Sequence, residues 1–184
     1  MGVSLYCCEN RRRKRFFQQL EISQDLGIAA STVHNALKPL EKMHAIQKAM
    51  QGFRVINKKK FYIYWGTVRR FEEDIVFSTF VDEDIEKIES SLPPVTYTAY
   101  TAYKLKFNEK PADYSEVYVY GNVHEIKKRF KKRKRPLNLI VLKDDKAIKQ
   151  LCGEIAPTGL IFADLWNLPH WYAIEFLRAL EARI

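Results

Sequence analysis

The sequence is poor in the residues and spacings that mark disulfide-rich and metal-binding proteins. It contains three cysteines, and an odd number with two adjacent members, Cys7 and Cys8, does not make a disulfide framework. No CxxC pair with zinc-site spacing is present, and the four histidines are scattered along the chain. We therefore expect reduced thiols and no metal centre.

Long apolar runs are also missing. No stretch approaches the roughly 18 consecutive apolar residues that a membrane-spanning helix needs. The N-terminal segment MGVSLYCCENRRRKRF has its charges after a short apolar stretch, unlike a signal peptide, and Tyr6 stands where a myristoylation signal has Ser or Thr. We predict a cytoplasmic protein that neither spans nor is anchored to a membrane.

The motifs of common enzyme and cofactor sites are absent as well. The sequence has no P-loop, GxGxxG, HExxH or GxSxG, so we expect no cofactor. PADYSE and NLIVLK are faintly similar to metal nucleases, with Asp113 and Glu116 as ligands and Lys143 as the cation. That pattern needs an acidic residue where Val141 stands. Asp164 in FADLW lies at the end of a predicted strand, where an aspartate acts in catalysis or, more often, caps the next turn. We predict that the protein is not an enzyme.

Positive charge is concentrated in the first third of the sequence. The formal net charge is +9. Residues 1–70 carry 14 Lys and Arg against 4 Asp and Glu, whereas residues 71–184 carry 17 against 18. Such an asymmetry indicates a polyanion-binding module joined to a nearly neutral one. Nucleic acid is the partner that we favour over a merely solvated basic surface.

A helix–turn–helix pattern lies inside this basic region. The apolar side of a first helix is predicted at Leu20, Ile22 and Leu26. Gly27 follows where the chain must turn, because glycine enters a left-handed conformation without steric cost. Ile28 is expected to fill the space between this helix and a second one over about residues 30–43. The second helix has a buried stripe at Val33, Ala36, Leu37 and Leu40.

Another side of this second helix is polar. Its candidate DNA-contacting residues are Ser31, Thr32, His34, Asn35 and Lys38. They carry hydrogen-bonding groups suited to base edges or phosphates. Ala29, at the expected N-cap, has no side-chain acceptor, and Pro39 lies inside the pattern, where we expect a kink followed by continued helix.

Two short apolar runs flank Gly52 and predict a β-hairpin after this helix. Cations in or just after the hairpin would make it a wing that contacts phosphates or the minor groove: Arg54, Lys58, Lys59 and Lys60. A further cluster precedes the first helix of the pattern and would hold DNA backbone from the other flank: Arg11, Arg12, Arg13, Lys14 and Arg15.

LEISQDLGIAASTVHNALKPLEKMHAI resembles the winged helix-turn-helix domains of prokaryotic transcriptional regulators, archaeal ones included. The resemblance covers about residues 1–65 and implies DNA binding without identifying a target site. Only about ten residues precede the basic cluster. The first helix of such a domain is therefore expected to be short, which would shift stability onto a second domain or a dimer partner.

Residues 66–184 predict an α/β domain with a central sheet. A buried connecting helix is expected in KKKFYIYWGTVRRFEEDI. Strands are expected in IVFSTFV, PPVTYT, SEVYVYG, LNLIVLK and GLIFADLWN, and helices in DEDIEKIESSL, AYTAYKLKF, VHEIKKRF and LPHWYAIEFLRALEARI. The last of these helices has apolar residues at helical spacing: Trp171, Ile174, Leu177, Leu180 and Ile184.

One segment of this domain is strongly basic. Residues 127–135, KKRFKKRKR, hold eight cations in nine positions: Lys127, Lys128, Arg129, Lys131, Lys132, Arg133, Lys134 and Arg135. Blocks of like charge repel one another and stay solvated unless an anion neutralises them. The run is either a solvated loop or a second nucleic-acid contact, with DNA backbone or RNA.

The layout TYTAYTAYKL, NLIVLKDD and LIFADLWNLPHWYAIEFLRAL resembles the C-terminal domain of AbiEi-type antitoxins. In that family a winged helix precedes an α/β domain that is similar to a degenerate nucleotidyltransferase. The resemblance implies autoregulatory DNA binding and neutralisation of a protein toxin.

The leading prediction is a nucleoid-associated transcriptional regulator that binds double-stranded DNA. A toxin-binding antitoxin is the first alternative, and a nucleic-acid-processing enzyme is the second. A homodimer is expected, because such regulators commonly bind two half-sites. The closing helix and KKKFYIYWGTVRR are candidate dimer elements, although we favour intramolecular core for their apolar residues.

Overall fold

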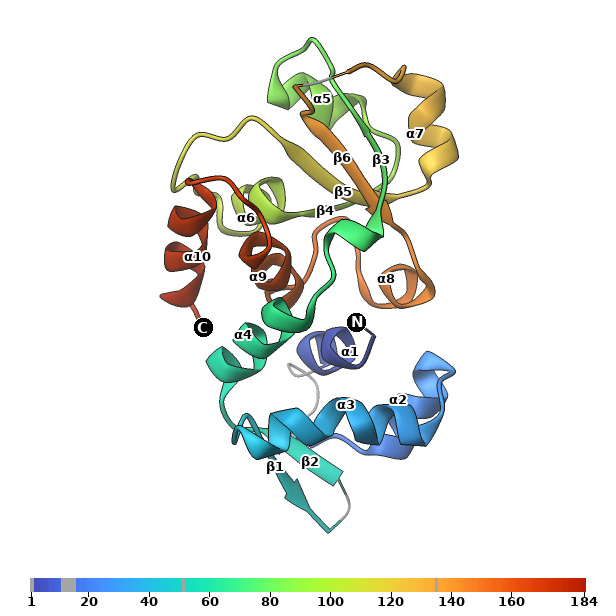
Figure 1. The fold of residues 1–184 in the computed structure, drawn as a ribbon, viewed down its shortest axis with the longest axis vertical. Coiled ribbons are helices and arrows are strands. Elements are labelled where there is room, and N and C mark those ends of the chain that lie inside the picture. The colour runs from blue at the N-terminus through green and yellow to red at the C-terminus, as the bar shows by residue number, and fades with distance from the viewer. Residues whose placement is uncertain (1, 11–15, 51, 135) are drawn as a thin grey trace.

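The computed structural model describes residues 2–10, 16–50, 52–134 and 136–184 (Figure 1). It has N-terminal helices with a small hairpin, followed by a four-stranded mixed sheet with interleaved helices. None of the described helices is both long and apolar enough to cross a bilayer. We refer to residues 2–57 as the N-terminal part and to residues 69–184 as the C-terminal part, with one connecting helix between them.

The N-terminal part contains α1 (Gly2–Asn10), α2 (Gln19–Leu26), α3 (Ala30–Lys42), β1 (Ile46–Ala49) and β2 (Gly52–Val55). Ile22, Val33 and Leu37 are fully buried between α2 and α3, as their spacing predicted. Leu20 was expected on the same apolar side, but it is 61% exposed, because the buried stripe of α2 runs through Ile22 and Leu26. Phe17 and Phe53 stack at 5.5 Å and attach the hairpin to the helices.

The first helix is short, with nine residues, as predicted. Four of its side chains are buried: Val3, Leu5, Tyr6 and Cys7. The helix packs against α2 and also against two helices of the C-terminal part, α8 (Lys146–Leu151) and α9 (Thr158–Trp166). Burial of apolar area is the main stabilising contribution to folding, so the short α1 draws part of its stability from the C-terminal part.

A continuous helix, α4 (Lys58–Val68), connects the two parts. Asn57 begins it, because its side chain accepts a hydrogen bond from the backbone N–H of Lys60. Phe61 and Trp65 are buried, and α4 packs along α9. Gly66 permits this close approach, since a Cβ there would lie 2.7 Å from the Trp166 ring. The predicted domain boundary at residue 65 falls inside this helix.

The C-terminal part follows the predicted alternation of strands and helices up to residue 143, and the next helix, α8, was not predicted. Its first elements are η1 (Glu72–Asp74), β3 (Ile75–Thr79), α5 (Ile85–Ser91), β4 (Thr96–Thr98) and α6 (Ala99–Phe107). β5 (Val117–Gly121), α7 (Val123–Arg129), β6 (Leu139–Lys143) and α8 come next. The strand order is β3-β6-β5-β4, in which β5 and β6 run parallel and the two edge strands run antiparallel to their neighbours.

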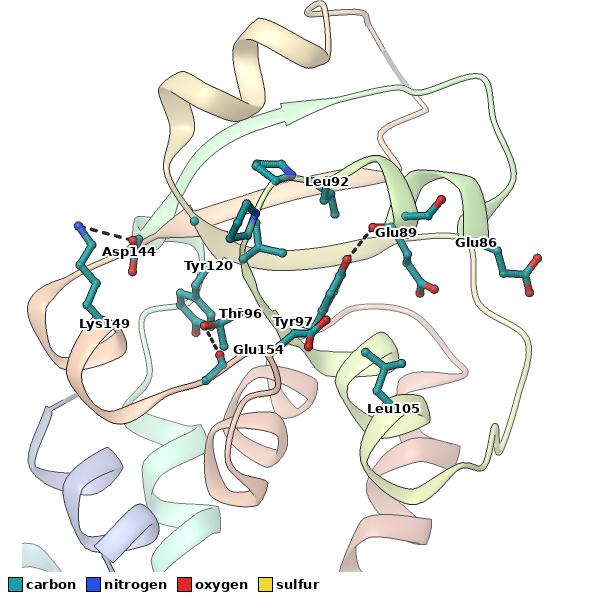
Figure 2. Close-up of a pocket in the computed structure, with 16 residues that line it drawn as sticks. Glu86, Glu89, Leu92, Thr96, Tyr97, Leu105, Tyr120, Asp144, Lys149 and Glu154 are labelled. Carbon is teal, nitrogen blue, oxygen red and sulfur yellow. Dashed lines mark hydrogen bonds and ion pairs between the residues drawn. The ribbon is translucent and has the colours of Figure 1, made fainter.

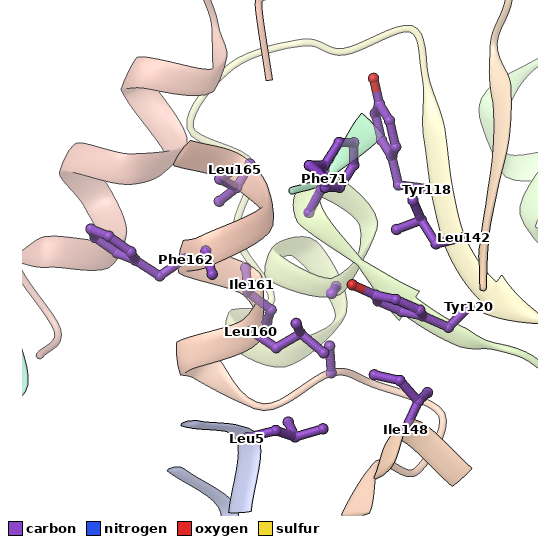
Figure 3. Packing of buried hydrophobic residues seen from close by; sticks show 14 of the residues in the cluster. Leu5, Phe71, Tyr118, Tyr120, Leu142, Ile148, Leu160, Ile161, Phe162 and Leu165 are labelled. Atoms are coloured by element: carbon purple, nitrogen blue, oxygen red, sulfur yellow. The ribbon is translucent and has the colours of Figure 1, made fainter. Parts of the chain in front are cut away.

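The core lies beneath this sheet. Every residue of β5 is buried, because α6 and α9 lie on one side of the sheet and α5 and α7 on the other (Figure 1). Figure 3 shows Tyr120 of β5 directed toward the helix that carries Ile161, whereas Tyr118 packs against Phe71. Leu5 of α1 lies at the lower edge of the same cluster. A single buried cluster therefore runs through both parts of the chain.

The predicted strand GLIFADLWN is wrong, because residues 158–166 form α9. A continuous apolar run is compatible with a buried strand and with a buried helix, and periodicity does not separate the two. Residues 159–165 are all buried, since α9 packs against α4, α6 and α10 (Ala173–Glu181). A helix enclosed in this way has no polar face that would reveal its period.

The closing helix exists, but its buried face differs from the predicted one. Ala173, Phe176 and Leu180 are buried in α10. Trp171 precedes the helix and is 73% exposed, and Ile174 is 51% exposed. The buried face of α10 is therefore rotated relative to the predicted one. Two large apolar side chains, Trp171 and Ile174, remain exposed to solvent.

Candidate nucleic-acid interface

The polar side of α3 forms one exposed line. Ser31, Asn35 and Lys38 are exposed, as their positions in the pattern predicted. Lys42, in the last turn, is also exposed and extends the same line, because positions three and four apart share a helix face. Lys42 was not among the predicted residues, although continuing the same spacing by one turn would have found it.

Two further predicted residues flank this line. His34 is half-buried on one side of it. Thr32 is exposed on the other side and lines a cleft toward the C-terminal part. The structure therefore groups Ser31, Asn35 and Lys38 and places Thr32 and His34 at the margins.

The turn before α3 holds this helix in place. Gly27 has φ 63°, the left-handed conformation that its position predicted. Ile28 is half-buried against the core of the helix pair. Ala29 is the N-cap and provides no side-chain hydrogen bond, so the first N–H groups of α3 stay open to water or to an anion. The helix continues through Pro39 to Lys42.

The hairpin lies directly after α3 and presents polar side chains of its own. Arg54 of β2 donates hydrogen bonds of 2.9 Å and 2.5 Å to Gln47 of β1, and both residues are exposed. Lys48 forms an ion pair with Glu41 of α3. Gln47 and Lys48 were not among the predicted contacts, because an alternating strand of four residues gives little signal.

The three lysines assigned to the wing lie just after the hairpin, at the start of the connecting helix. Lys58, Lys59 and Lys60 form the first turn of α4 instead of extending the hairpin. Lys59 pairs with Glu181 of α10 at 2.7 Å, and Lys60 donates to the carbonyl of Met43 at 2.9 Å. Two of the three thus hold helices together within the chain. The cluster Arg11–Arg15 lies outside the described residues.

The cations of α3 differ from Lys59 and Lys60 because they hold no other described part of the chain in place. Neither Lys38 nor Lys42 forms an ion pair with any residue that the structure describes. Exposed cations on one helix face repel each other modestly in water. An anion placed across both would remove that repulsion, which makes this face suited to a phosphate backbone.

The basic run at residues 127–134 lies at the other end of the molecule, far from α3 (Figure 1). Arg129 donates to the Ser91 carbonyl at 2.9 Å, and Lys127 lies over the Phe77 ring at 5.5 Å. The Thr79 hydroxyl binds the backbone of Lys131 and of Arg133, at 2.8 Å each. Lys128, Lys132 and Lys134 are exposed, and Arg135 lies outside the described residues.

Asp164 is buried inside α9 rather than at a strand end. Its carboxylate accepts hydrogen bonds from Arg69 at 2.8 Å, from Thr98 at 2.6 Å and from Tyr120 at 2.7 Å. Arg69 also pairs with Asp74. These contacts occupy the carboxylate on all sides without a path to solvent, so Asp164 connects α4, β4 and β5 structurally.

Burial and charge act together on this network. Burial alone would lower the pKa of Arg69, but the Asp164 carboxylate beside it raises that pKa above its ordinary value. Burial, and then the Asp164 charge, raise the pKa of Tyr120 well above its usual range. Both hydrogen-bond donors therefore keep their protons at neutral pH.

The nuclease-like residues do not come together. Glu116 directly precedes β5, whereas Lys143 ends β6, and these strands are parallel with Val117 opposite Leu139. Glu116 and Lys143 thus lie at opposite ends of the strands, about 16 Å apart along the strand direction. Asp113 is exposed and pairs with Lys110 at 2.5 Å. Within the part of the chain that the structure describes, no cluster of three metal-ligating side chains occurs.

A pocket of about 910 Å³ lies on the C-terminal part (Figure 2). Its lining includes four carboxylates, Glu86, Glu89, Asp144 and Glu154, against one cation, Lys149. Lys149 pairs with Asp144 at 3.5 Å. An acidic lining repels phosphate, so this pocket does not belong to the basic surface on α3.

Comparisons of the chain with protein families, with curated proteins and with solved structures gave no significant match. Any function must therefore be argued from the site itself.

Proposed function

We propose that the protein is a transcriptional regulator that binds double-stranded DNA through a winged helix-turn-helix. The observation that carries the proposal is the line of Ser31, Asn35, Lys38 and Lys42 on the exposed side of α3. This line follows a glycine turn of φ 63° and precedes a two-stranded hairpin. In such domains the first helix of the pair holds the second one so that its exposed side enters the major groove, and α2 and α3 have this arrangement.

The dimensions and chemistry of α3 suit this role. Thirteen residues give a helix of about 20 Å, and the major groove is roughly 12 Å wide and admits one helix. Asn35 can donate and accept toward the edge of an adenine, whereas Lys38 and Lys42 can reach phosphate or guanine. Arg54 on the hairpin would contact the adjacent backbone.

The first test is the salt dependence of DNA binding. The double variant Lys38→Ala/Lys42→Ala should bind a mixed-sequence 30-base-pair duplex more weakly. The slope of log affinity against log salt should become shallower by about 0.9 for each lost phosphate contact. Fluorescence anisotropy at several salt concentrations measures both quantities.

The matched control removes two exposed lysines of the C-terminal part, Lys87 and Lys110, which pair with Glu83 and Asp113. Lys87→Ala/Lys110→Ala changes the net charge equally but leaves α3 intact, so its slope should match the unmodified protein. Equal slopes for all three proteins would refute the proposal.

The variant Asn35→Ala tests base recognition separately from phosphate binding. After selection of a preferred site from a random duplex library, Asn35→Ala should reduce the preference for that site over mixed sequence by about 1–3 kcal/mol. Its affinity for mixed sequence should change little, because that affinity comes from phosphate contacts. An unchanged preference would show that Asn35 does not recognise a base.

The second candidate function is an AbiEi-like antitoxin, and it is favoured by one observation. Trp171 and Ile174 are 73% and 51% exposed beside each other on the C-terminal part, and large aromatic side chains are enriched at protein interfaces. The same patch would serve a homodimer. Sedimentation of the protein alone and with the product of a neighbouring gene separates the two, and Trp171→Ser should weaken whichever association occurs.

A further inference from the structure

The basic run of the C-terminal part is anchored to the fold on both sides. It begins in the last turn of α7 and leads toward β6, and residues 127–134 hold seven cations in eight positions. Phe130, the apolar residue among them, is 9% exposed and belongs to the hydrophobic core. Beyond the run, the Asn138 side chain accepts from the backbone N–H of Val81 at 2.7 Å and donates to the Val81 carbonyl at 2.8 Å.

A buried hydroxyl group holds the middle of the run. Thr79, the last residue of β3, is fully buried. Its hydroxyl donates to the carbonyl of Lys131 and accepts from the backbone N–H of Arg133, at 2.8 Å each. Like charges repel one another, so a cationic segment without such contacts stays mobile in solvent. The backbone of residues 131–133 is instead fixed by a partner that lies inside the fold.

Five cations of the run remain available to a partner: Lys128, Lys131, Lys132, Arg133 and Lys134. All five are exposed, and none of their side chains forms an ion pair or a hydrogen bond with a described residue. Lys127 and Arg129 differ, because Lys127 lies over the Phe77 ring and Arg129 donates to the Ser91 carbonyl. A group of neighbouring cations without counter-charges is the electrostatic footprint of a polyanion-binding surface.

The acidic residues near the run do not pair with it. Asp82, Glu83 and Asp84 follow β3 in the loop that Asn138 contacts. Glu83 pairs with Lys87 at 3.2 Å, whereas neither Asp82 nor Asp84 forms an ion pair with any cation that the structure describes. The same holds within the described ranges for the acidic side chain of α7 itself, at position 125. The five cations therefore keep their charge available.

The surroundings of these cations favour a phosphate backbone over bases. Proteins that bind single strands supply aromatic side chains on which the bases stack. Phe130 is buried, so residues 127–134 present no aromatic side chain to a partner. A contact made by cations alone depends on the density of phosphates, and a duplex carries about one charge per 1.7 Å of its axis. A duplex is therefore the better match for this surface.

We propose that residues 128–134 form a second surface that binds the phosphate backbone of double-stranded DNA and reads no bases. Residues 131–134 span at most about 14 Å, and each strand of a duplex carries a phosphate about every 3.4 Å of its axis. The segment can thus place neighbouring cations beside neighbouring phosphates. Because its backbone is already fixed by Thr79, less conformational entropy is lost when DNA binds.

This second surface is separate from the face of α3, because the two lie at opposite ends of the molecule (Figure 1). Its contribution to affinity is the same for every DNA sequence, since phosphates carry no sequence information. It would bind DNA even if α3 did not. The second surface and the proposed function can therefore fail independently.

The first test measures duplex binding in the Lys38→Ala/Lys42→Ala protein, which lacks the cations of α3. Adding Lys128→Ala/Lys132→Ala/Lys134→Ala should weaken binding of a mixed-sequence 30-base-pair duplex by about tenfold or more at roughly 100 mM salt. The slope of log affinity against log salt should become shallower by about 0.9 for each lost contact. The urea midpoint should not fall, because these three side chains contact no described residue.

The matched control, in the same background, is Lys110→Ala/Lys149→Ala/Arg178→Ala. It removes the same charge from three exposed cations elsewhere on the C-terminal part, each of which forms an ion pair. Its duplex affinity and its salt slope should match those of the background protein. Equal losses in the two triple variants would show that only net charge matters and would overturn the second surface. So would an unchanged affinity in the first of them.

Chemical modification then locates the contact in the unmodified protein. Acetic anhydride labels exposed lysines, and mass spectrometry compares labelling with and without DNA. We expect the duplex to protect Lys128, Lys132 and Lys134 more strongly than a single strand of the same length, and to leave Lys110 unprotected. The duplex as partner is ruled out if the single strand protects these lysines better. The same conclusion follows if phosphatidylglycerol vesicles protect them and the duplex does not.

The labelling also separates this inference from the proposed function. If the duplex protects Lys132 and Lys134 but neither Lys38 nor Lys42, the proposed function fails and the second surface stands. If the duplex protects only the lysines of α3, the second surface is refuted and the proposed function stands.

Discussion

The N-terminal and C-terminal parts of the chain use their charged side chains in opposite ways. In the C-terminal part, Arg69 and Asp164 are buried and bind each other and the hydroxyl groups around them. In the N-terminal part, Lys38 and Lys42 lie in solvent and bind no described residue. One set of charges holds the chain together, and the other remains available to a partner.

The difference shows which charged side chains carry information about function. A buried charge must be paired, because an isolated one costs several kcal/mol, so its presence is explained once its partners are found. An exposed, unpaired row of cations has no such explanation within the fold. DNA binding is therefore inferred from the exposed cations of α3 and not from the larger network around Asp164.

The largest loss in the free energy of unfolding is expected for Asp164→Asn. The substitution leaves Arg69 buried with only Asp74 as an anionic partner, and removing one member of a buried pair costs about 3–5 kcal/mol. Urea denaturation should show that loss in the free energy of unfolding. The matched control is Asp113→Asn, which breaks the exposed pair with Lys110 and should cost far less, because exposed ion pairs contribute little to stability.

Equal, small effects of the two aspartate variants would show that the Asp164 network does not stabilise the fold. The Asp164→Asn protein is also informative about the surface. At a temperature where it remains folded, its DNA affinity should equal that of the unmodified protein, because α3 lies outside the network.

Much of the fold was predictable from local signals. Gly27 at φ 63°, the uncapped Ala29 and the paired hairpin strands were each implied by one or two residues. The sheet strands up to β6 had β-branched or aromatic residues between clear turn signals. α9 failed because burial on all sides removes the polar period on which such a prediction depends.

The site was predictable only as a face of one helix. The spacing of Ser31, Asn35 and Lys38 fixed that face, since helical geometry is local. Lys59 and Lys60 could not be placed, because their partners, Glu181 and the Met43 carbonyl, are contacts of the tertiary structure. The cleft that Thr32 lines was likewise invisible, since α1, α3, α4 and α8 meet there only after folding.

Gly52→Ala tests how the hairpin of the N-terminal part is held against Phe17. Gly52 has φ 155°, and a Cβ there would lie 2.0 Å from the Phe17 carbonyl oxygen. The strand must therefore move away from Phe17, at a cost of about 1–3 kcal/mol. Proteolysis of the hairpin and urea denaturation should both report the loss, and DNA affinity should fall with it.

Gly153→Ala is the matched control. Nothing lies within 4 Å of a Cβ at Gly153, and its backbone needs no glycine. We expect its stability to be unchanged or slightly higher, because alanine restricts the unfolded chain. A similar loss in both variants would show that the contact with Phe17 is not what constrains the hairpin.

A smaller change in stability is expected at high pH, where the buried tyrosines of the C-terminal part ionise. Burial, and then the hydrogen bond that its hydroxyl donates to Glu116, raise the pKa of Tyr172 to about 12, from an ordinary value near 10. The unfolded chain therefore loses this proton first as pH rises. Its contribution to stability is complete below pH 10, falls between about pH 10 and 12, and is absent above that range.

Tyr172→Phe isolates that contribution. The variant should lose less stability than the unmodified protein between pH 9 and pH 11.5, measured as the urea midpoint at each pH. Part of the alkaline loss should remain, because burial also raises the pKa of Tyr100 and Tyr118. Parallel curves for the two proteins would mean that Tyr172 ionises equally in the folded and unfolded chain. The salt dependence of DNA binding at pH 8 should be the same for both, since Tyr172 lies among the buried contacts and not on the cationic face of α3.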